Sequence, residues 1–168
     1  YVMGDAAEII INDGVVYEVA AAGYISGVDP TRINFEHPPL GKYIFGLSYM
    51  LFKNMIWLNI ISSIIVFSGF YLLLRRLNIS YLLSLFSLVV LGSLSVVQAT
   101  VSQSLLDWHY LAALLVIFNL LLNNKFSIKN SIFLGVMLGA FLSIKYPFPL
   151  ALLLYGLLFL KLFKIKQV

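Results

Sequence analysis

The sequence has no cysteine and little charge. Only 11% of its 168 residues are charged, whereas 61% are hydrophobic. The absence of cysteine excludes a disulfide framework and a thiolate metal site. Soluble domains have roughly 25% charged residues, so this composition predicts a membrane protein with several spans. The net charge of +4 does not indicate a nucleic-acid partner, because the basic residues lie at predicted helix ends and not among exposed aromatic residues.

Several chemical signatures are also missing. The chain has no phosphate-binding glycine loop, no Ser/His/Asp triad spacing and no helical His-x-x-x-His pair. ATP hydrolysis and zinc-protease chemistry therefore have no support. The acidic side chains and His37 are compatible with a bound divalent cation, but no spacing requires one. The chain starts at Tyr1 without a charged-then-apolar leader and stops just after a predicted helix, so we expect part of a longer protein.

Acidic residues are almost absent after residue 39, since six of the seven lie in residues 1–39. No uncharged window in that segment reaches the roughly 18–20 residues that a membrane span requires. Residues 15–25 and 40–52 are apolar but too short to span comfortably. We therefore predict that residues 1–54 form an extramembrane loop with two short helices. The first lies on the membrane surface, and the second is interfacial or re-entrant.

Residues 55–168 predict an all-α, polytopic membrane helix bundle. The last 30-residue apolar run is divided at Lys145-Tyr146-Pro147, because proline and its preceding residue interrupt a helix. This division gives five predicted spans of suitable length and hydropathy, at residues 55–74, 81–99, 105–122, 131–145 and 147–163.

Charge predicts the orientation of this bundle. Threading the five spans alternately places seven of the eleven basic residues on one face: Arg75, Arg76, Lys125, Lys129, Lys161, Lys164 and Lys166. All seven acidic residues fall on the opposite face or at its membrane edge. By the positive-inside rule the basic face is cytoplasmic. We therefore expect a multi-pass protein of the cell membrane whose loop 1–54 is extracytoplasmic.

Polar residues from four separate segments gather at the predicted outer membrane edge. Ionisable groups at this depth are costly unless they are paired, face a cavity or serve a function. Their convergence therefore predicts a site, and the candidates are Asp13, Tyr17, Glu36, His37, Lys42, Asp107, His109 and Lys145.

The two candidates in the first predicted helix are four residues apart, so Asp13 and Tyr17 share one helix face. The alternative, which the spacing alone favours, is that Asp13 only caps that helix by accepting backbone N–H bonds. His37 precedes Pro38-Pro39 at a predicted helix N-terminus, where free N–H groups and the helix dipole favour an anion such as phosphate. The alternative is a loop histidine that bonds to Glu36.

The later candidates also have two interpretations. Asp107 opens a predicted span, where it serves either the site or as a helix cap. Lys145 interrupts an apolar run at the outer end of its helix. Its ammonium group can extend to water, or it can pair with a lipid phosphate.

Residues 35–42, Phe-Glu-His-Pro-Pro-Leu-Gly-Lys, resemble the signature of the GT-C class of polyprenyl-phosphate-sugar glycosyltransferases. The resemblance is to the protein O-mannosyltransferase family and its bacterial lipid A aminoarabinose transferase relatives. Asp13 and Tyr17 match the aspartate and aromatic residue upstream of that signature. Residues 105–107, Leu-Leu-Asp, resemble the Leu-Asp that opens a later helix. Residues 135–146 resemble the family's Gly-x-x-x-Gly helix ending in Lys-Tyr.

The resemblance implies a GT-C-like fold and an enzyme. Its activity would be inverting transfer of mannose or a related sugar from a polyprenyl-phosphate donor to a hydroxyl of a protein or lipid, on the extracytoplasmic face. Asp13 would be the general base, and the lipid phosphate would be bound by His37, Lys42 and Lys145. Tyr17, Glu36 and Asp107 would orient the substrates or the histidine. These residue types suit such chemistry, because the hydroxyl needs a carboxylate nearby and the departing phosphate needs fixed cations.

The chain departs from the family at two points. Gly14 stands where the family commonly has Glu, which leaves Asp5, with Glu8, as the alternative base. Complete members also have many more spans, so the resemblance covers only their N-terminal half. Two other functions remain open. The short length favours a non-catalytic membrane subunit with this architecture, and charged residues at membrane depth favour a small transporter, although no inverted repeat is visible.

Overall fold

The computed structural model describes residues 13–123, 127–146, 150 and 154–156. All regular secondary structure in these residues is helical, which confirms the predicted all-α class. The elements are α1 (Asp13–Ile25), the 3-10 helix η1 (Pro30–Arg32), α2 (Leu40–Phe52), α3 (Leu58–Arg76), α4 (Tyr81–Ser93), α5 (Ser95–Ser102), α6 (Leu106–Leu121) and α7 (Ile128–Ile144).

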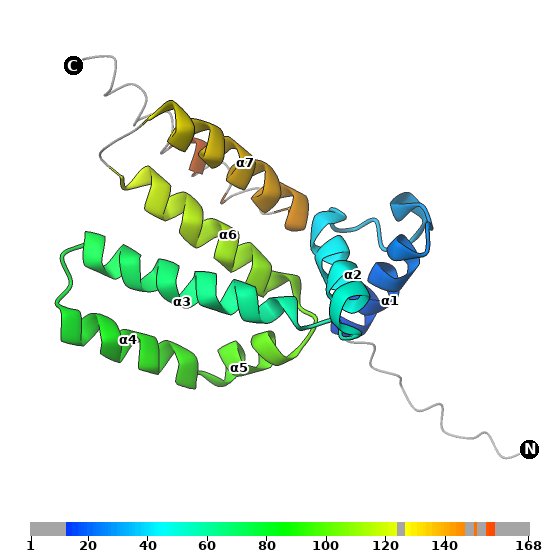
Figure 1. Ribbon diagram of the computed structural model, residues 1–168, viewed down its shortest axis with the longest axis horizontal. Coiled ribbons are helices and arrows are strands. Elements are labelled where there is room, and N and C mark those ends of the chain that lie inside the picture. The colour runs from blue at the N-terminus through cyan, green and yellow to red at the C-terminus, as the bar shows by residue number, and fades with distance from the viewer. Residues whose placement is uncertain (1–12, 124–126, 147–149, 151–153, 157–168) are drawn as a thin grey trace, which may run out of the picture.

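The helices form a bundle with a helical hairpin at one end. Figure 1 shows α3 and α6 running in the same direction, with α4 beside α3 and α7 beside α6 in the opposite direction. Helices α1 and α2 pack on each other at the end where α3 and α6 begin and α7 finishes. The surface at this end is therefore built from segments that are far apart in the sequence.

Polar contacts and a close approach hold α3 against α6. The Asn119 side-chain amide donates to the Gly69 carbonyl at 2.8 Å, and the Trp108 indole N–H donates to the Ser63 hydroxyl at 2.8 Å. A Cβ atom at Gly69 would lie 3.2 Å from the Cβ of Leu115. This pairing fixes where the first turn of α6 lies.

The hairpin of α1 and α2 packs through small and aromatic residues. Tyr17 and Ala21 on α1 and Phe45 on α2 are all buried in the main hydrophobic core. Gly46 allows the helices to approach closely, because a Cβ atom there would lie 3.2 Å from the Ala21 carbonyl oxygen and 2.5 Å from Ile25. The packing presents the connecting loop and the start of α2 to the end of the bundle.

The structure corrects the continuous helix predicted for residues 81–99. Helices α4 and α5 are separate and bent by 64°, because Leu94 between them has extended backbone (φ −67°, ψ 127°). The preceding Gly92-Ser93 pair has weak helix propensity. Two side chains satisfy carbonyls beside the break: Gln98 donates to Gly92 O at 3.3 Å, and Ser93 donates to Val90 O at 2.8 Å.

Helix length sets how many membrane crossings the described residues support. Within them, α3 alone is long and apolar enough to cross a membrane by itself, and α4 with α5 qualifies only as a bent pair. Helices α6 and α7 are apolar but shorter. Residues 147–163, the fifth predicted span, lie almost entirely outside the described residues. The five-span bundle therefore stays a prediction.

Large apolar side chains are exposed on α4, and basic residues end α3. On α4, Leu82, Phe86 and Val89 are 77%, 64% and 69% exposed, which is unusual for large apolar residues on a helix surrounded by water. Arg75 and Arg76 end α3 at the far end of the bundle from α1 and α2 (Figure 1). Basic residues at this end and acidic residues at the opposite end form the charge pattern that predicts the orientation of the chain in the membrane. The orientation itself remains a prediction.

Candidate functional site

Lys42 organises the loop between α1 and α2. Its side chain, in the first turn of α2, is completely buried. The ammonium group donates to the backbone carbonyls of Asn34 and His37, the latter at 2.9 Å, and lies 3.5 Å from the Tyr24 hydroxyl. Burial lowers the pKa of Lys42, and the nearby Glu36 carboxylate partly offsets this. Lys42 therefore contacts the loop that carries the predicted motif.

Two residues, Asn34 in the loop and Tyr24 in α1, determine the path of this loop. Asn34 has a left-handed backbone (φ 47°), a conformation that asparagine tolerates better than most residues. This turns the chain so that its carbonyl faces Lys42. The Tyr24 hydroxyl donates to the Ile33 carbonyl at 3.0 Å. The path of the loop is thus fixed from both helices.

His37 lies against α1. Its ring centroid is 5.9 Å from that of Tyr17, and the two rings are tilted by 60°. The His37 Nδ1 atom is buried and has no hydrogen-bond partner in the part of the chain that the structure describes. Burial lowers the pKa of His37, and the charges of Lys145 and Lys42 lower it further. The imidazole is therefore mainly neutral at pH 7.

The charges of three carboxylates act on the same buried aromatic residue. Tyr17 is only 3% exposed. Its pKa is raised to about 12, first by burial and then by the negative charges of Asp13, Asp107 and Glu36. These carboxylates come from the start of α1, the start of α6 and the loop before α2, so three separate segments contribute to the electrostatic environment of Tyr17.

An ion pair joins α6 to the end of α7. Lys145 Nζ lies 2.7 Å from Asp107 Oδ1, and the two side chains are 32% and 55% exposed. Lys145 directly follows α7 with extended backbone, and Asp107 lies in the first turn of α6. Both groups remain accessible at the end of the bundle.

All seven residues predicted for the site thus gather at one end of the bundle, from four separate segments: Asp13, Tyr17, Glu36, His37, Lys42, Asp107 and Lys145. Their chemical roles stay predictions. His109 lies apart, because its ring points into the bundle and its Nδ1 is 2.6 Å from the Ser62 hydroxyl. The alternative base, Asp5, lies outside the described residues. Within the described ranges, no group of three or more His, Asp or Glu side chains is arranged to hold a metal ion.

Sequence reasoning missed two supporting contacts. Tyr24, which helps to hold the loop, lies seven residues after Tyr17 on the same face of α1, and this spacing of two helical turns could have revealed it. Glu18 accepts a hydrogen bond from the Ser104 hydroxyl at 2.5 Å. That contact ties α1 to the segment before α6, and no local pattern in the sequence indicates it.

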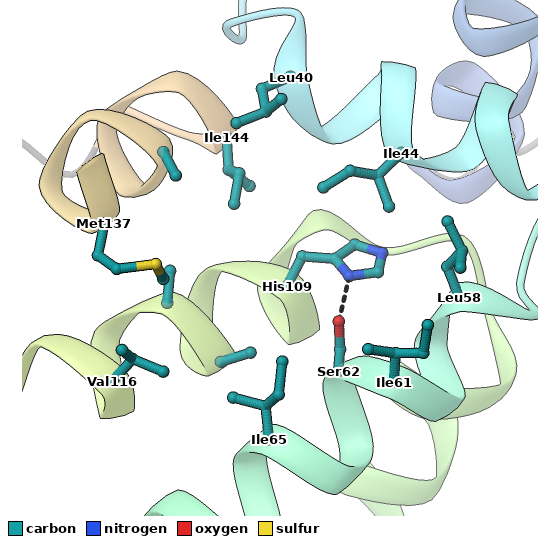
Figure 2. A pocket seen from close by; sticks show the side chains of 13 residues that line it. Leu40, Ile44, Leu58, Ile61, Ser62, Ile65, His109, Val116, Met137 and Ile144 are labelled. Atoms are coloured by element: carbon teal, nitrogen blue, oxygen red, sulfur yellow. Dashed lines mark hydrogen bonds between the residues drawn. The ribbon is translucent and has the colours of Figure 1, made fainter. Parts of the chain in front are cut away.

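An apolar groove opens between α2, α3, α6 and α7, directly next to the site. Its volume is about 300 Å³, and Figure 2 shows its lining side chains. Leu40 and Ile144 connect it to the site, since Leu40 follows the two prolines and Ile144 precedes Lys145. Charged groups therefore stand at one end of a space suited to hydrocarbon.

Comparison of the chain with protein-family models, with curated proteins and with solved structures gives no match. The arrangement offers accessible carboxylates, one accessible ammonium group, a neutral imidazole and an adjoining apolar groove. These groups suit a substrate that combines a phosphate, a hydroxyl-bearing group and a hydrocarbon chain.

Proposed function

We propose that this chain carries the active site of an inverting glycosyltransferase that uses a polyprenyl-phosphate sugar at the extracytoplasmic membrane surface. The donor sugar is mannose or a related sugar, and the acceptor is a hydroxyl of a protein or lipid. One observation carries the proposal: the charges of Asp13, an exposed carboxylate, and of Lys145, an accessible ammonium group, both act on the His37 imidazole, in the loop that leads to Leu40 of the apolar groove.

Asp13 serves as the general base in this proposal. Its carboxylate takes the proton of the acceptor hydroxyl while the acceptor oxygen attacks the anomeric carbon from the face opposite the phosphate. The bond between that carbon and the phosphate oxygen breaks, and its electron pair leaves with the polyprenyl phosphate. Asp13 suits this role because it is exposed and begins α1 beside the other site residues. A positioned base of this kind contributes about 10²–10⁴-fold to rate.

Lys145 and His37 bind the departing phosphate in this proposal. Lys145 is accessible, so a phosphate can replace Asp107 as its anionic partner. The largely neutral His37 donates a hydrogen bond and gains positive character when the phosphate approaches. Lys42 does not bind the phosphate directly in this proposal. Its ammonium group already donates to the His37 carbonyl, so its role is to hold the loop that carries His37.

The other predicted residues orient these groups. Tyr17 packs on His37 and fixes the plane of the imidazole. Glu36 and Asp107 add negative charge beside Tyr17, where they are suited to hydrogen-bond sugar hydroxyls. The fixed arrangement is consistent with catalysis by preorganised charge, in which groups are placed before the transition state forms.

The direct test is sugar transfer by the full-length protein in proteoliposomes, with polyprenyl-phosphate mannose and polyprenyl-phosphate aminoarabinose as donors. We expect transfer with inversion at the anomeric carbon and a kcat at least about 100-fold lower for Asp13→Asn. Asp29→Asn is the matched control, because Asp29 is a loop carboxylate that bonds only to Thr31 in the described contacts. Full activity of Asp13→Asn would remove Asp13 as the base.

A non-catalytic membrane subunit is the second candidate function. It is favoured by one observation: the two cations of the site already have partners, Lys42 with loop carbonyls and Lys145 with Asp107. Failure of the full-length protein to transfer either sugar, together with failure to bind polyprenyl phosphate, would favour this second function.

A further inference from the structure

A second groove lies along the seam between α3 and α6, toward the end of the bundle away from α1 and α2. Its lining recurs at helical spacing on both helices, with Ile65, Gly69 and Leu72 on α3 and Val116 and Leu120 on α6. These helices run side by side in the same direction (Figure 1), so the groove follows their axes. Its volume of about 320 Å³ is at the lower end of the range for small-molecule sites. This far groove therefore has room for one extended chain.

Arg76 stands at one end of the far groove. It is the last residue of α3, its side chain is exposed, and it lines the groove. Its guanidinium group has no hydrogen-bond or ion-pair partner in the part of the chain that the structure describes. The neighbouring Arg75 differs, because it donates to the Ile79 carbonyl and does not line the groove. Arg76 is thus available to bind an anion that enters the far groove.

The charge at this end of the bundle selects an anionic ligand. The carboxylates that the structure describes lie on α1, in the loop after it and in the first turn of α6, all toward the opposite end. The C-terminal ends of α3 and α6 each carry about half a negative charge, which the two positive charges of Arg75 and Arg76 exceed. The far groove therefore ends in net positive charge that no described carboxylate neutralises.

The rest of the lining selects a hydrocarbon chain. The donor groups of the two polar side chains midway along the groove are already used. The Ser68 hydroxyl donates to the Ile64 carbonyl, and the Asn119 amide donates to the Gly69 carbonyl at 2.8 Å. Between Arg76 and Ile65 a ligand therefore lies mainly against aliphatic side chains.

The length of the far groove matches one leaflet of a bilayer. From Ile65 to Arg76 the distance along the α3 axis is about 16 Å. This is about half of the roughly 30 Å thickness of a hydrocarbon core. A lipid whose head group lies at Arg76 would thus reach the middle of the membrane at Ile65. The groove beside the site begins there, since both grooves share Ile65 and Val116.

We propose that the far groove binds an anionic phospholipid, with its phosphate on the Arg76 guanidinium and one acyl chain along the aliphatic lining toward Ile65. A guanidinium suits this role because two of its N–H groups can donate to one phosphate in parallel. Basic pockets between membrane spans are typical sites for anionic head groups. The lipid is separate from the sugar donor, whose phosphate is proposed to bind at Lys145. The inference rests on the proposed function only for the placement of the chain across a membrane.

The test compares phosphatidylglycerol with phosphatidylethanolamine that carries the same acyl chains. Binding to the full-length protein is measured by native mass spectrometry. We expect the wild-type protein to prefer phosphatidylglycerol by about fivefold or more, the effect of one arginine beside anionic lipid. Arg76→Met should remove the preference, whereas the matched control Arg75→Met should retain most of it. Equal binding of the two lipids to the wild-type protein, or an equal loss of preference in the two variants, would overturn the inference.

Two further measurements test the acyl chain. Ser68→Phe fills the far groove from an exposed position and should reduce binding of both lipids. Ile64→Phe, which is also exposed on α3 but does not line the groove, should leave binding unchanged. Glycerol 3-phosphate has the phosphate without a hydrocarbon chain and should compete weakly. Full lipid binding in Ser68→Phe, or displacement of phosphatidylglycerol by an equal concentration of glycerol 3-phosphate, would overturn the inference.

Polyprenyl phosphate is the competitor that separates the far groove from the donor position. If it displaced phosphatidylglycerol from Lys145→Met as well as from the wild-type protein, the far groove would belong to the donor and the inference would be wrong. We expect no such displacement from Lys145→Met, because that variant lacks the proposed ligand of the donor phosphate.

Binding in this experiment requires no sugar transfer, so its outcome is distinguishable from that of the proposed function. Asp13→Asn should retain the full preference for phosphatidylglycerol, because Asp13 begins α1 at the opposite end of the bundle. A preference for phosphatidylglycerol in a protein that transfers no sugar would retain the lipid site and reject the enzyme. Transfer activity without this preference would do the reverse.

Discussion

The ammonium group of Lys145 lies 2.7 Å from the carboxylate of Asp107 and so joins the end of α7 to the start of α6. Both side chains are substantially exposed, and exposed pairs of this kind contribute about 0–1 kcal/mol to stability. The pair is thus too weak to explain by stability alone why a lysine interrupts the apolar run 131–160. Because the pair is weak, however, a phosphate can easily replace Asp107 as the partner of Lys145.

Replacing Lys145 by methionine should separate binding from stability. We expect the affinity for polyprenyl phosphate to fall about tenfold or more, because a hydrogen bond to a charged group contributes about 1.5–3 kcal/mol. The free energy of unfolding should change by less than about 1 kcal/mol, as for other exposed pairs. Isothermal titration in detergent and thermal unfolding measure the two quantities.

The partner variant Asp107→Asn serves as the control for that exchange. It removes the competing carboxylate and leaves Lys145 free, so we expect unchanged or tighter binding of polyprenyl phosphate. An equal loss of affinity in Asp107→Asn and Lys145→Met would mean that the pair acts only by holding α6 and α7 together.

Lys42→Met should lower stability because Lys42 is buried and contacts two loop carbonyls. Without the ammonium group these carbonyls lose their partner, and an unsatisfied buried polar group costs about 1–3 kcal/mol. Lys53→Met is the matched control at the other end of α2. Lys53 is exposed, and its ammonium group lies 5.7 Å from the centre of the Tyr49 ring, a contact of about 0.5–1 kcal/mol. Thermal unfolding in detergent compares the two, and equal effects would contradict the role of Lys42 in holding the loop.

The helices were largely predictable because their apolar runs are long and their ends carry local signals. Helix α6 (Leu106–Leu121) lies within the predicted 105–122, and α2 matches residues 40–52. The break at Leu94 was not predicted, since hydropathy continues unchanged across it. Its cause is a short stretch of weak helix propensity together with side-chain bonds that satisfy the freed carbonyls.

The gathering of site residues was predictable, but the contacts within the site were not. Alternate threading of spans places Asp107 and Lys145 at one membrane edge, so their proximity follows from topology. The burial of Lys42 depends on the path of the loop, which the left-handed backbone of Asn34 and the Tyr24 hydroxyl determine. These contacts form within an irregular loop between two helices, and no helical or strand periodicity describes the path of such a loop.

Gly46→Ala should loosen the packing of α1 on α2. The added Cβ atom would lie 2.5 Å from an Ile25 side-chain carbon and 3.2 Å from the Ala21 carbonyl oxygen. Overpacking of this kind costs about 1–3 kcal/mol. Gly139→Ala is the control on α7, where the added Cβ atom would meet nothing within 4 Å in the described structure. There the substitution should be neutral or stabilising by up to about 1 kcal/mol, because alanine favours helix. Thermal unfolding in detergent compares the stability of the two variants. A larger loss of stability in Gly139→Ala than in Gly46→Ala would contradict the packing described for Gly46.

The pKa of His37 reports directly whether α1, the loop before α2 and the end of α7 meet. Burial lowers it below the ordinary histidine value of 6.5, the positive charges of Lys145 and Lys42 lower it further, and Glu36 and Asp13 raise it. A folded-state pKa below the unfolded value means that the unfolded chain binds more protons between those two values. The contribution of His37 to stability is therefore fully present above about pH 6.5 and decreases as the pH falls toward the folded-state pKa.

Nuclear magnetic resonance titration of the His37 imidazole, selectively labelled with ¹³C and ¹⁵N, measures this pKa in detergent. We expect a value below 6.5 in the wild-type protein, a higher value in Lys145→Met and a lower value in Asp13→Asn, because each variant removes a charge that acts on the ring. Arg76→Met is the control, since α3 ends at Arg76, at the far end of the bundle, and it should leave the pKa unchanged. Polyprenyl phosphate should raise the pKa by adding negative charge beside the ring. If Lys145→Met and Asp13→Asn both left the pKa unchanged, α1 and the end of α7 would not meet at His37, and the proposed site would be wrong.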